Sequence, residues 1–251
     1  MVRAEFDDQP RVIDLHAHIL PGLDDGPRTP AGSVAMARAA VADGIRLVAA
    51  TPHVRDDWPT APEEMERGVE ELRGELAEAG VPLELRTGGE VALEQLAGRP
   101  VEELRRFGLG GNPDYLLVET PYSGWPPWLG DVVLRLCAAG VTPVLAHPER
   151  NREVQEQPER LLPLVRSGAL VQLTAASLDG RLGRRSRAAS FRLLELGLAH
   201  LLASDAHEPR IRAIGLSAAV VALGDERLAR WLTVDVPSAI VEATPLPPAP
   251  N

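Results

Sequence analysis

The sequence predicts an α/β fold in which parallel strands alternate with helices. About seven short apolar or alternating runs recur along the 251 residues, and the segments between them have the apolar spacing of helices. Several of these helical segments are followed by glycine, the residue that a left-handed C-terminal cap prefers. Strands that alternate with helices are joined by crossovers, so the chain is expected to form a barrel or an open doubly wound sheet.

The expected strands are, in chain order, Val12–His18, Arg46–Thr51, Leu83–Thr87, Tyr115–Glu119, Thr142–Ala146, Ala169–Leu173 and His200–Ser204. Between the first two strands, Thr29 is expected to cap a helix that has Pro30 at its first position. That helix runs to Asp43, before Gly44. Later helices are expected to end at Gly80, Gly140, Gly168 and Gly197. The charged segment Glu63–Ala79 is interpreted as an outer helix with a solvated face.

The composition shows no domain boundary. Residues 1–243 are therefore expected to form a single domain, which is long enough to bury a sizeable core. The segment 244–251, TPLPPAPN, is expected to be a disordered tail because its prolines block helix and sheet.

Charge and hydropathy exclude several classes of partner. The formal charge of −10 repels polyanions and argues against nucleic acid. No apolar run reaches the roughly 18 residues of a membrane span, so membrane insertion is not expected. The first ten residues, MVRAEFDDQP, lack the apolar stretch of a secretory signal, and we expect a cytoplasmic protein.

Two residue types limit the chemistry. Cys137 is the only cysteine, which excludes an internal disulfide and a cysteine-rich zinc site. A cysteine-dependent phosphatase needs an arginine six residues after its thiolate, and here that position holds Pro143. The chain contains no lysine, so a Schiff base, a P-loop lysine and a carboxylated lysine between two metals are also excluded.

Five of the six histidines lie where the expected strands end. His16 and His18 form a His-x-His pair, and the strand period of two points both imidazoles to one side. The other residues of this pattern follow later strands: His53, His147, Asp205 and His207. Barrel enzymes gather their catalytic groups at this rim, so the pattern predicts a metal site. His200 lies outside the pattern and is assigned a structural role.

Carboxylates complete the predicted ligand set. Glu90 follows the third strand in TGGEV, and Glu119 ends the fourth in VETP. The loop PGLDDGP carries Asp24 and Asp25, and its glycines and prolines define a turn that can hold one carboxylate over the strand ends. Asp14 has the strand parity of the first two histidines and is expected to orient an imidazole.

Imidazole and carboxylate ligands without thiolates suit divalent ions such as Mn²⁺, Fe²⁺ or Zn²⁺. The number of candidate ligands predicts two or three ions, with Glu90 as a natural bridge. Clustered ions convert a bridging water to hydroxide, so the expected reaction is a hydrolysis. Arg150, three residues after His147, and Arg210 and Arg212, after the Asp-x-His pair, favour a phosphoester, because a guanidinium fork matches two phosphate oxygens.

Several segments, in order and spacing, resemble the bacterial protein-tyrosine phosphatases of the PHP (polymerase and histidinol phosphatase) superfamily, of the CpsB/CapC type. They are DLHAHILPGLDDGP, ATPH, TGGEV, VETP, VLAHPERN, VQLTAASL and LASDAH. The resemblance implies a distorted seven-stranded (β/α) TIM-like barrel, the PHP barrel, with a trinuclear centre of manganese or iron. It implies a phosphotyrosine protein as substrate, the tail of a bacterial tyrosine kinase that controls capsule or exopolysaccharide synthesis.

The resemblance also implies a division of the ligands. One ion would be bound by His16, His18, Glu90 and Asp205, a second by Glu90, Glu119 and His147, and a third by Asp25, His53 and His207. Arg150 would hold the substrate phosphate, assisted by Arg210 or Arg212. After Asp-x-His the family commonly has asparagine and an Arg-Pro-rich loop, whereas this chain reads EPRIRAIGL.

Two other enzymatic readings use the same residues. A PHP phosphoesterase could act on a small phosphomonoester such as histidinol phosphate with the same metals. An amidohydrolase also uses His-x-His on a barrel, with Glu90 in place of the absent carboxylated lysine. A metal-stabilised scaffold that binds a kinase would instead need closed coordination spheres. The sequence leaves the native metal and the oligomeric state open.

Overall fold

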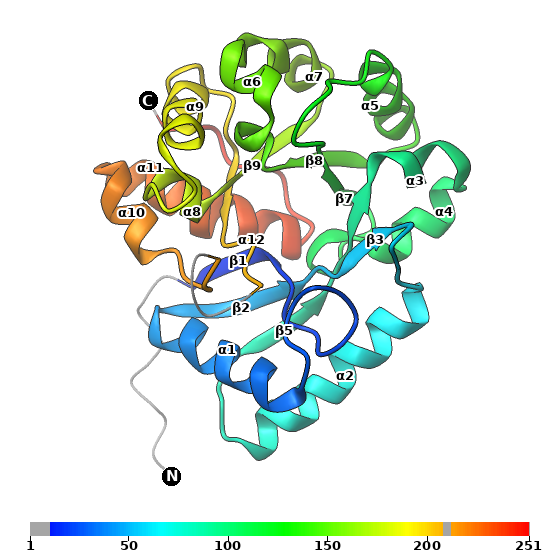
Figure 1. The fold of residues 1–251 in the computed structure, drawn as a ribbon, viewed down its shortest axis with the longest axis vertical. Coiled ribbons are helices and arrows are strands. Elements are labelled where there is room, and N and C mark those ends of the chain that lie inside the picture. The colour runs from blue at the N-terminus through cyan, green and yellow to red at the C-terminus, as the bar shows by residue number, and fades with distance from the viewer. Residues whose placement is uncertain (1–10, 208–211, 251) are drawn as a thin grey trace.

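Parallel strands wrapped by helices form a mixed α/β fold in the computed structural model, which describes residues 11–207 and 212–250 (Figure 1). The strands are β1 (Val12–Ala17), β2 (Ile45–Ala50), β3 (His53–Arg55), β4 (Trp58–Pro59), β5 (Glu84–Thr87), β6 (Glu90–Ala92), β7 (Tyr115–Glu119), β8 (Thr142–Ala146), β9 (Leu170–Thr174) and β10 (Leu201–Ala203). Every expected strand is present. The short strands β3, β4 and β6 were not expected, because two or three residues are too few to show a periodic pattern.

The strands pair in two sheets. One has the order β1-β2-β5, and the other has the order β10-β9-β8-β7-β6-β3-β4. Every pair is parallel except the β3–β4 hairpin. Strand β3 follows β2 after only Thr51 and Pro52, and β6 follows β5 after only Gly88 and Gly89. The parallel α/β prediction is therefore confirmed, while a single closed sheet is not formed by the strand pairs of the described residues.

Helices surround the strands (Figure 1). They are α1 (Pro30–Ala42), α2 (Pro62–Glu78), α3 (Leu93–Gly98), α4 (Val101–Leu104), α5 (Leu129–Ala138), α6 (Arg152–Glu156), α7 (Leu162–Arg166), α8 (Ala175–Leu178), α9 (Arg184–Glu195), α10 (Ser217–Leu223), α11 (Glu226–Arg230) and α12 (Val236–Val241). Short 3₁₀ turns include η2 (Leu109–Gly111) and η3 (Pro148–Arg150).

The helix boundaries agree with the predicted capping signals. The Thr29 side chain accepts a hydrogen bond from Gly32 N at the start of α1. The glycines that follow α1, α2, α5, α7 and α9 all have positive φ, namely Gly44, Gly80, Gly140, Gly168 and Gly197. In α2, Met65, Val69, Leu72 and Leu76 are buried at helical spacing, while the glutamates face solvent.

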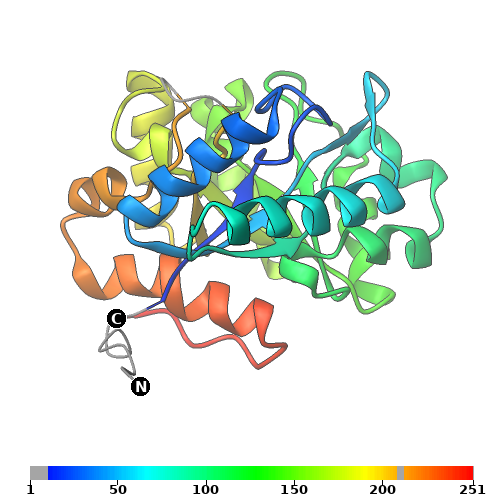
Figure 2. The same ribbon diagram turned by 90° about the horizontal axis from the view of Figure 1, so that it is seen from below.

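The last helical segment lies along one side of the strands, next to β1 (Figure 2). Helices α11 and α12 are continuous through a π-helical turn, η5 (Trp231–Asp235). Pro237 has no N–H to donate to Thr233 O, which accounts for the widened turn. Beyond α12, residues 244–250 form no helix or strand, and the Trp231 indole donates to Pro247 O at 3.2 Å. Among the described residues, no helix is long and apolar enough to cross a membrane.

His200 lies outside the site and links β10 to β9. Its Nδ1 accepts a hydrogen bond from Val171 N at 3.2 Å, and its own N donates to Val171 O at 2.9 Å. An acceptor nitrogen must be unprotonated. Burial lowers the pKa of His200, so the folded protein favours the neutral ring.

We expect the contribution of His200 to stability to depend on pH. Because its pKa is lower in the folded state, the unfolded state takes up the proton first, and the contribution is lost as pH falls below about 6.5. The free energy of unfolding, measured in urea from pH 8 to pH 5, should fall more steeply for the wild type than for His200→Asn. A constant difference between the two proteins across this range would contradict the prediction.

Candidate metal centre

The nine sequence-predicted ligands lie together at the carboxyl ends of the strands. They are His16, His18, Asp25, His53, Glu90, Glu119, His147, Asp205 and His207. Most of them are buried, and Asp25 is the most open, with 43% of its side chain exposed. Six strand ends converge here, those of β1, β2, β5, β7, β8 and β10, because parallel strands present the same ends to one side of the fold.

Glu90 lies at the middle of the histidines. Its Oε1 lies 2.8 Å from His147 Nε2, and its Oε2 lies 2.9 Å from His53 Nδ1. The same Oε2 lies 3.5 Å from His16 Nε2 and 3.4 Å from His18 Nε2. One carboxylate therefore reaches four imidazoles from three different parts of the chain.

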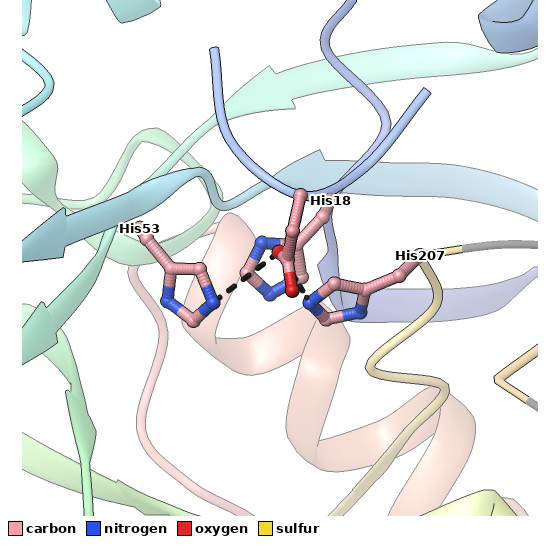
Figure 3. Close-up of side chains that lie close together, drawn as sticks. His18, His53 and His207 are labelled. Atoms are coloured by element: carbon pink, nitrogen blue, oxygen red, sulfur yellow. Dashed lines mark ion pairs between the residues drawn. The ribbon is translucent and has the colours of Figure 1, made fainter. Parts of the chain in front are cut away.

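Asp25 faces a second set of imidazoles. Its Oδ1 lies 3.1 Å from His207 Nε2 and 3.5 Å from His53 Nε2. The rings of His18 and His207 are stacked, with centroids 3.7 Å apart. Figure 3 shows how His18, His53 and His207 approach one another from separate segments.

Asp205 and Glu119 complete the cluster. Asp205 Oδ1 lies 3.5 Å from both His16 Nε2 and His18 Nε2. Glu119 Oε2 lies 3.9 Å from His53 Nδ1. Four groups have all their ligand atoms within 4.8 Å of one another: His18, Asp25, His53 and His207; His16, His147 and Asp205; His16, His18 and Glu90; and His53, Glu90 and Glu119. The division implied by the family resemblance differs in three respects. His18 also groups with Asp25, His53 and His207, His53 also groups with Glu90 and Glu119, and His147 groups with His16 and Asp205.

Outer partners orient two of the imidazoles. Gln172 Oε1 lies 2.9 Å from His16 Nδ1, and Asp24 Oδ2 lies 2.6 Å from His18 Nδ1. Each leaves the Nε2 atom to face the other ligands. The expected role of Asp14 is wrong: its Oδ1 accepts from the backbone N of His16 and of Ser204, because its side chain lies beside the backbone of β1 and β10 and not beside an imidazole ring.

The backbone is constrained where the ligands emerge. His147 and Asp205 have left-handed φ values of 38° and 51°, a conformation that costs non-glycine residues free energy. Gly26 lies so close to the end of β1 that a Cβ atom there would stand 2.2 Å from His18 O. Glycine at this position therefore lets the loop hold Asp24 and Asp25 against the histidines.

Opposite charges offset the cost of burial. Burial raises the pKa of Glu90, but His16 and His147 outweigh it and hold that pKa well below its ordinary value. Burial lowers the pKa of His18, and Asp24, Asp205 and Glu90 more than compensate, so that pKa is raised. The buried carboxylates thus require positive charge close by.

The residues fit divalent metal ions. Glu90 Oε2 and His53 Nδ1 face each other at 2.9 Å without the geometry of a hydrogen bond, and they and His147 Nδ1 are buried with no hydrogen-bond partner among the described residues. Such atoms are costly to bury unless a cation or another partner binds them. The donor set combines imidazole nitrogens with carboxylate oxygens, which suits Mn²⁺, Fe²⁺ or Zn²⁺.

A cavity of about 410 Å³ opens beside the cluster and is lined by arginines. Arg150 Nη1 donates to Asp205 Oδ2 at 2.6 Å, and its guanidinium lies 4.5 Å from the centroid of the Tyr122 ring. Arg212 Nη1 lies 3.1 Å from His207 Nε2, on the Asp25 side of the cavity. Arg210, the other candidate for a phosphate contact, lies outside the described residues.

Several residues of the site were not predicted. Arg55 lines the cavity and donates to Glu119 Oε1 at 3.2 Å. Glu149, fully buried, accepts from Thr174 N and Ser177 Oγ and so ties the turn that carries Arg150 to the end of β9. Gln172 could have been found in the sequence, because it is a polar side chain in the otherwise apolar buried strand VQLT. Nothing in the sequence distinguishes Arg55 from the chain's many other arginines. The Pro-Glu-Arg segment likewise does not mark Glu149 as a buried residue.

Comparison with known proteins agrees with this arrangement. The model of the family described as "Capsular polysaccharide synthesis, CpsB/CapC" matches residues 12–241. The tyrosine-protein phosphatase YwqE of Bacillus subtilis is 38% identical over 218 residues, which cover 86% of this chain and 85% of YwqE. CapC of Staphylococcus aureus is 30% identical over 199 residues, which cover 78% of this chain and 77% of CapC.

A solved structure is also closely similar. It comes from a study of YwqE from Bacillus subtilis and CpsB from Streptococcus pneumoniae, which describes them as unique metal-dependent tyrosine phosphatases. The TM-score is 0.84 at 34% sequence identity, and the alignment covers 95% of this chain and 99% of the other. The fold of this chain therefore has a precedent in a solved structure.

The contact between Asp24 and His18 can be tested by changing one atom. Asp24→Asn keeps the shape of the side chain but removes the charge that orients the His18 imidazole, and we expect metal affinity to fall about 10- to 100-fold. Metal content after dialysis against a weak chelator, measured by mass spectrometry, reports the change. Glu78→Gln makes the same chemical change on an exposed face of α2 and should retain the metal content of the wild type. Equal retention by both variants would show that Asp24 does not support the centre.

Proposed function

The chain belongs to the CpsB/CapC family, and we propose that it is a metal-dependent protein-tyrosine phosphatase. The observation that carries this proposal is the arginine-lined cavity that opens directly onto the cluster of imidazoles and carboxylates. A phosphate dianion needs cationic donors, and a hydrolytic metal centre needs the ligands beside them. Both occur within one site.

The nine clustered side chains would hold two or three divalent ions, with Mn²⁺ or Fe²⁺ favoured and Zn²⁺ a further candidate. Glu90 is the bridging ligand in this proposal, because each of its oxygens faces a different histidine. When bound, such ions supply an activated water and neutralise charge on phosphate oxygens. The chain's own residues then have to bind the phosphate, orient it and keep the ligands in place.

Arg150 is suited to bind the phosphate. Its Nη1 is held by Asp205 and one face of its guanidinium by the Tyr122 ring, so the group is fixed before substrate arrives. A preorganised donor of this kind stabilises the charge that develops in the transition state. Arg212 faces the same cavity beside Asp25 and would bind a second phosphate oxygen. We also keep Arg210 as a candidate on the sequence alone.

The thiol chemistry of other phosphatases has no counterpart in this site. Cys137 lies on α5 and packs against the hydrophobic core. Burial raises the pKa of its thiol, which disfavours the reactive thiolate.

The proposed substrate is a phosphotyrosine protein, the tail of a bacterial tyrosine kinase that controls capsule or exopolysaccharide synthesis. The capsular description of the family supports this choice. A cytoplasmic location goes with it, and suits a chain that has a single cysteine.

For the fold, we infer a distorted seven-stranded barrel that takes up residues 1–243 as one domain, with 244–251 as a tail. Two features support it. Strands β2 and β5 each continue into the other sheet as β3 and β6. Next to the first and last strands, Asp205 N donates to His16 O at 2.8 Å and His18 N donates to Ala206 O at 2.9 Å.

The proposed function predicts metal-dependent hydrolysis of a phosphotyrosine peptide. Phosphate release should be lost on removal of metal by a chelator and recovered when Mn²⁺ is restored. Cys137→Ser should retain most of the activity, because the thiol takes no part. Activity in metal-free protein, or a trapped phosphocysteine, would refute the mechanism. Faster turnover of histidinol phosphate than of the peptide would favour a small-molecule phosphoesterase instead.

Arg150 can be separated from the structural residues by substitution. Arg150→Ala should lower kcat/KM on a phosphotyrosine peptide about 100-fold while retaining metal and thermal stability, because a preorganised donor is lost. Arg150→Lys should restore only part of the activity, since a point charge cannot replace the guanidinium fork. Arg152→Ala removes an exposed arginine two residues away and is the matched control. Loss of metal from Arg150→Ala would assign the residue a structural role.

A further inference from the structure

The loop between β7 and α5 carries an unusual share of the chain's aromatic residues. The whole chain has three Phe, two Tyr and four Trp, and Tyr122, Trp125 and Trp128 all lie within this one loop. Tyr122 is 48% exposed and Trp128 is 42% exposed. Large rings are costly to leave in water, so exposed rings beside an active site point to a ligand that covers them.

Tyr122 and Trp128 line a second cavity that adjoins the first. It has a volume of about 330 Å³, and its walls include Leu93, Pro121, Tyr122, Pro126 and Trp128. Arg55 and Tyr122 line both cavities, so the two spaces meet between these side chains. The first cavity presents three arginines together with Asp25 and His53. The second presents mainly apolar and aromatic groups, with Glu94 and Glu119 as its acidic side chains.

Both walls of this junction are held in place. Asn151 Nδ2 donates to Pro121 O at 2.7 Å, and Arg152 N donates to Tyr122 O at 3.0 Å, which ties the loop to the segment after β8. The Tyr122 ring also stacks on His147, with centroids 5.9 Å apart. On the other side, Arg55 donates to Glu119 and Asp57. A passage with fixed walls can select a ligand by shape.

We propose that the cavity between Tyr122 and Trp128 is the binding site for the aromatic ring of the phosphotyrosine and the peptide residue next to it. This inference rests on the proposed function, since it takes the phosphate to lie beside Arg150. The group esterified to that phosphate must extend out of the first cavity. The adjoining apolar cavity offers ring faces that match an aryl group. Tyr122 then acts as a specificity-determining residue, and Trp128 binds the peptide beyond it.

The kinetic test compares two peptides of identical sequence that carry phosphotyrosine or phosphoserine. Tyr122→Leu should lower kcat/KM about tenfold more for the phosphotyrosine peptide than for the phosphoserine peptide, because only the aryl group stacks. Tyr122→Phe keeps the ring and should restore the selectivity to within about twofold of wild type. Trp128→Leu should raise KM for the phosphotyrosine peptide about fivefold, with a smaller change in kcat. Leu134→Ala, which removes an exposed apolar side chain on α5 outside the cavity, is the control.

An equal loss on both peptides with Tyr122→Leu would mean that Tyr122 only orients Arg150, and would overturn the aryl site. A binding measurement on the metal-loaded protein separates this inference from the function on which it rests. A peptide with a non-hydrolysable aryl phosphonate should quench tryptophan fluorescence and bind about tenfold more tightly than its alkyl phosphonate counterpart. Trp128→Leu should remove most of the quenching.

Wild-type protein that hydrolyses neither peptide, but still binds the aryl phosphonate selectively, would refute the phosphatase and support the aryl site. Wild-type protein that hydrolyses phosphotyrosine yet binds both phosphonates equally would support the phosphatase and refute the aryl site. The two proposals therefore fail in different experiments.

Discussion

The structure depends on the burial of one carboxylate, Glu90, among four imidazoles from three parts of the chain. A buried carboxylate is destabilising unless positive charge surrounds it, and the charge must come from residues that are distant in sequence. His16, His53 and His147 reach it only if the end of β1, the start of β3 and the end of β8 lie at the same edge of the fold. The strand arrangement and the site therefore depend on each other. Bound cations can complete the charge balance.

Short interruptions in two strands make this convergence possible. Pro52 separates β2 from β3, and Gly88 and Gly89 separate β5 from β6. A Cβ atom on Gly89 would stand 2.7 Å from the Phe107 ring, so glycine is required for the chain to pass at this point. Glu90 N then donates to Pro52 O at 3.1 Å, which joins the two continuing strands beside the cluster. Regular strand pairing is thus interrupted just before the two ligands His53 and Glu90.

Around this centre, polar and aromatic groups form a connected layer. Asp205 contacts His16 and His18 through one oxygen and Arg150 through the other. The guanidinium packs on Tyr122, whose ring also stacks on the His147 ring. Such a layer makes Arg150, the Tyr122 ring and the proposed metal ligands geometrically dependent on one another. Specificity for an aryl phosphate and the capacity to hydrolyse it can then arise from the same few side chains.

The sequence by itself determined the alternation of strand and helix, the helix ends at glycine and the full set of candidate ligands, because periodicity, capping and residue chemistry are local properties. His16 and His18, for example, show their shared direction in the strand period of two. Tertiary structure alone decided which ligands face one another: His53, for example, lies beside both Glu90 and Asp25. It also decided which residues orient the imidazoles: Gln172 and Asp24 do so, whereas Asp14 accepts hydrogen bonds from the backbone. Tyr122, Trp128 and Arg55 likewise became a wall of the site only in three dimensions. These pairings depend on how the ends of separate strands are placed in space, and a one-dimensional pattern carries no distance between residues that are far apart in the chain.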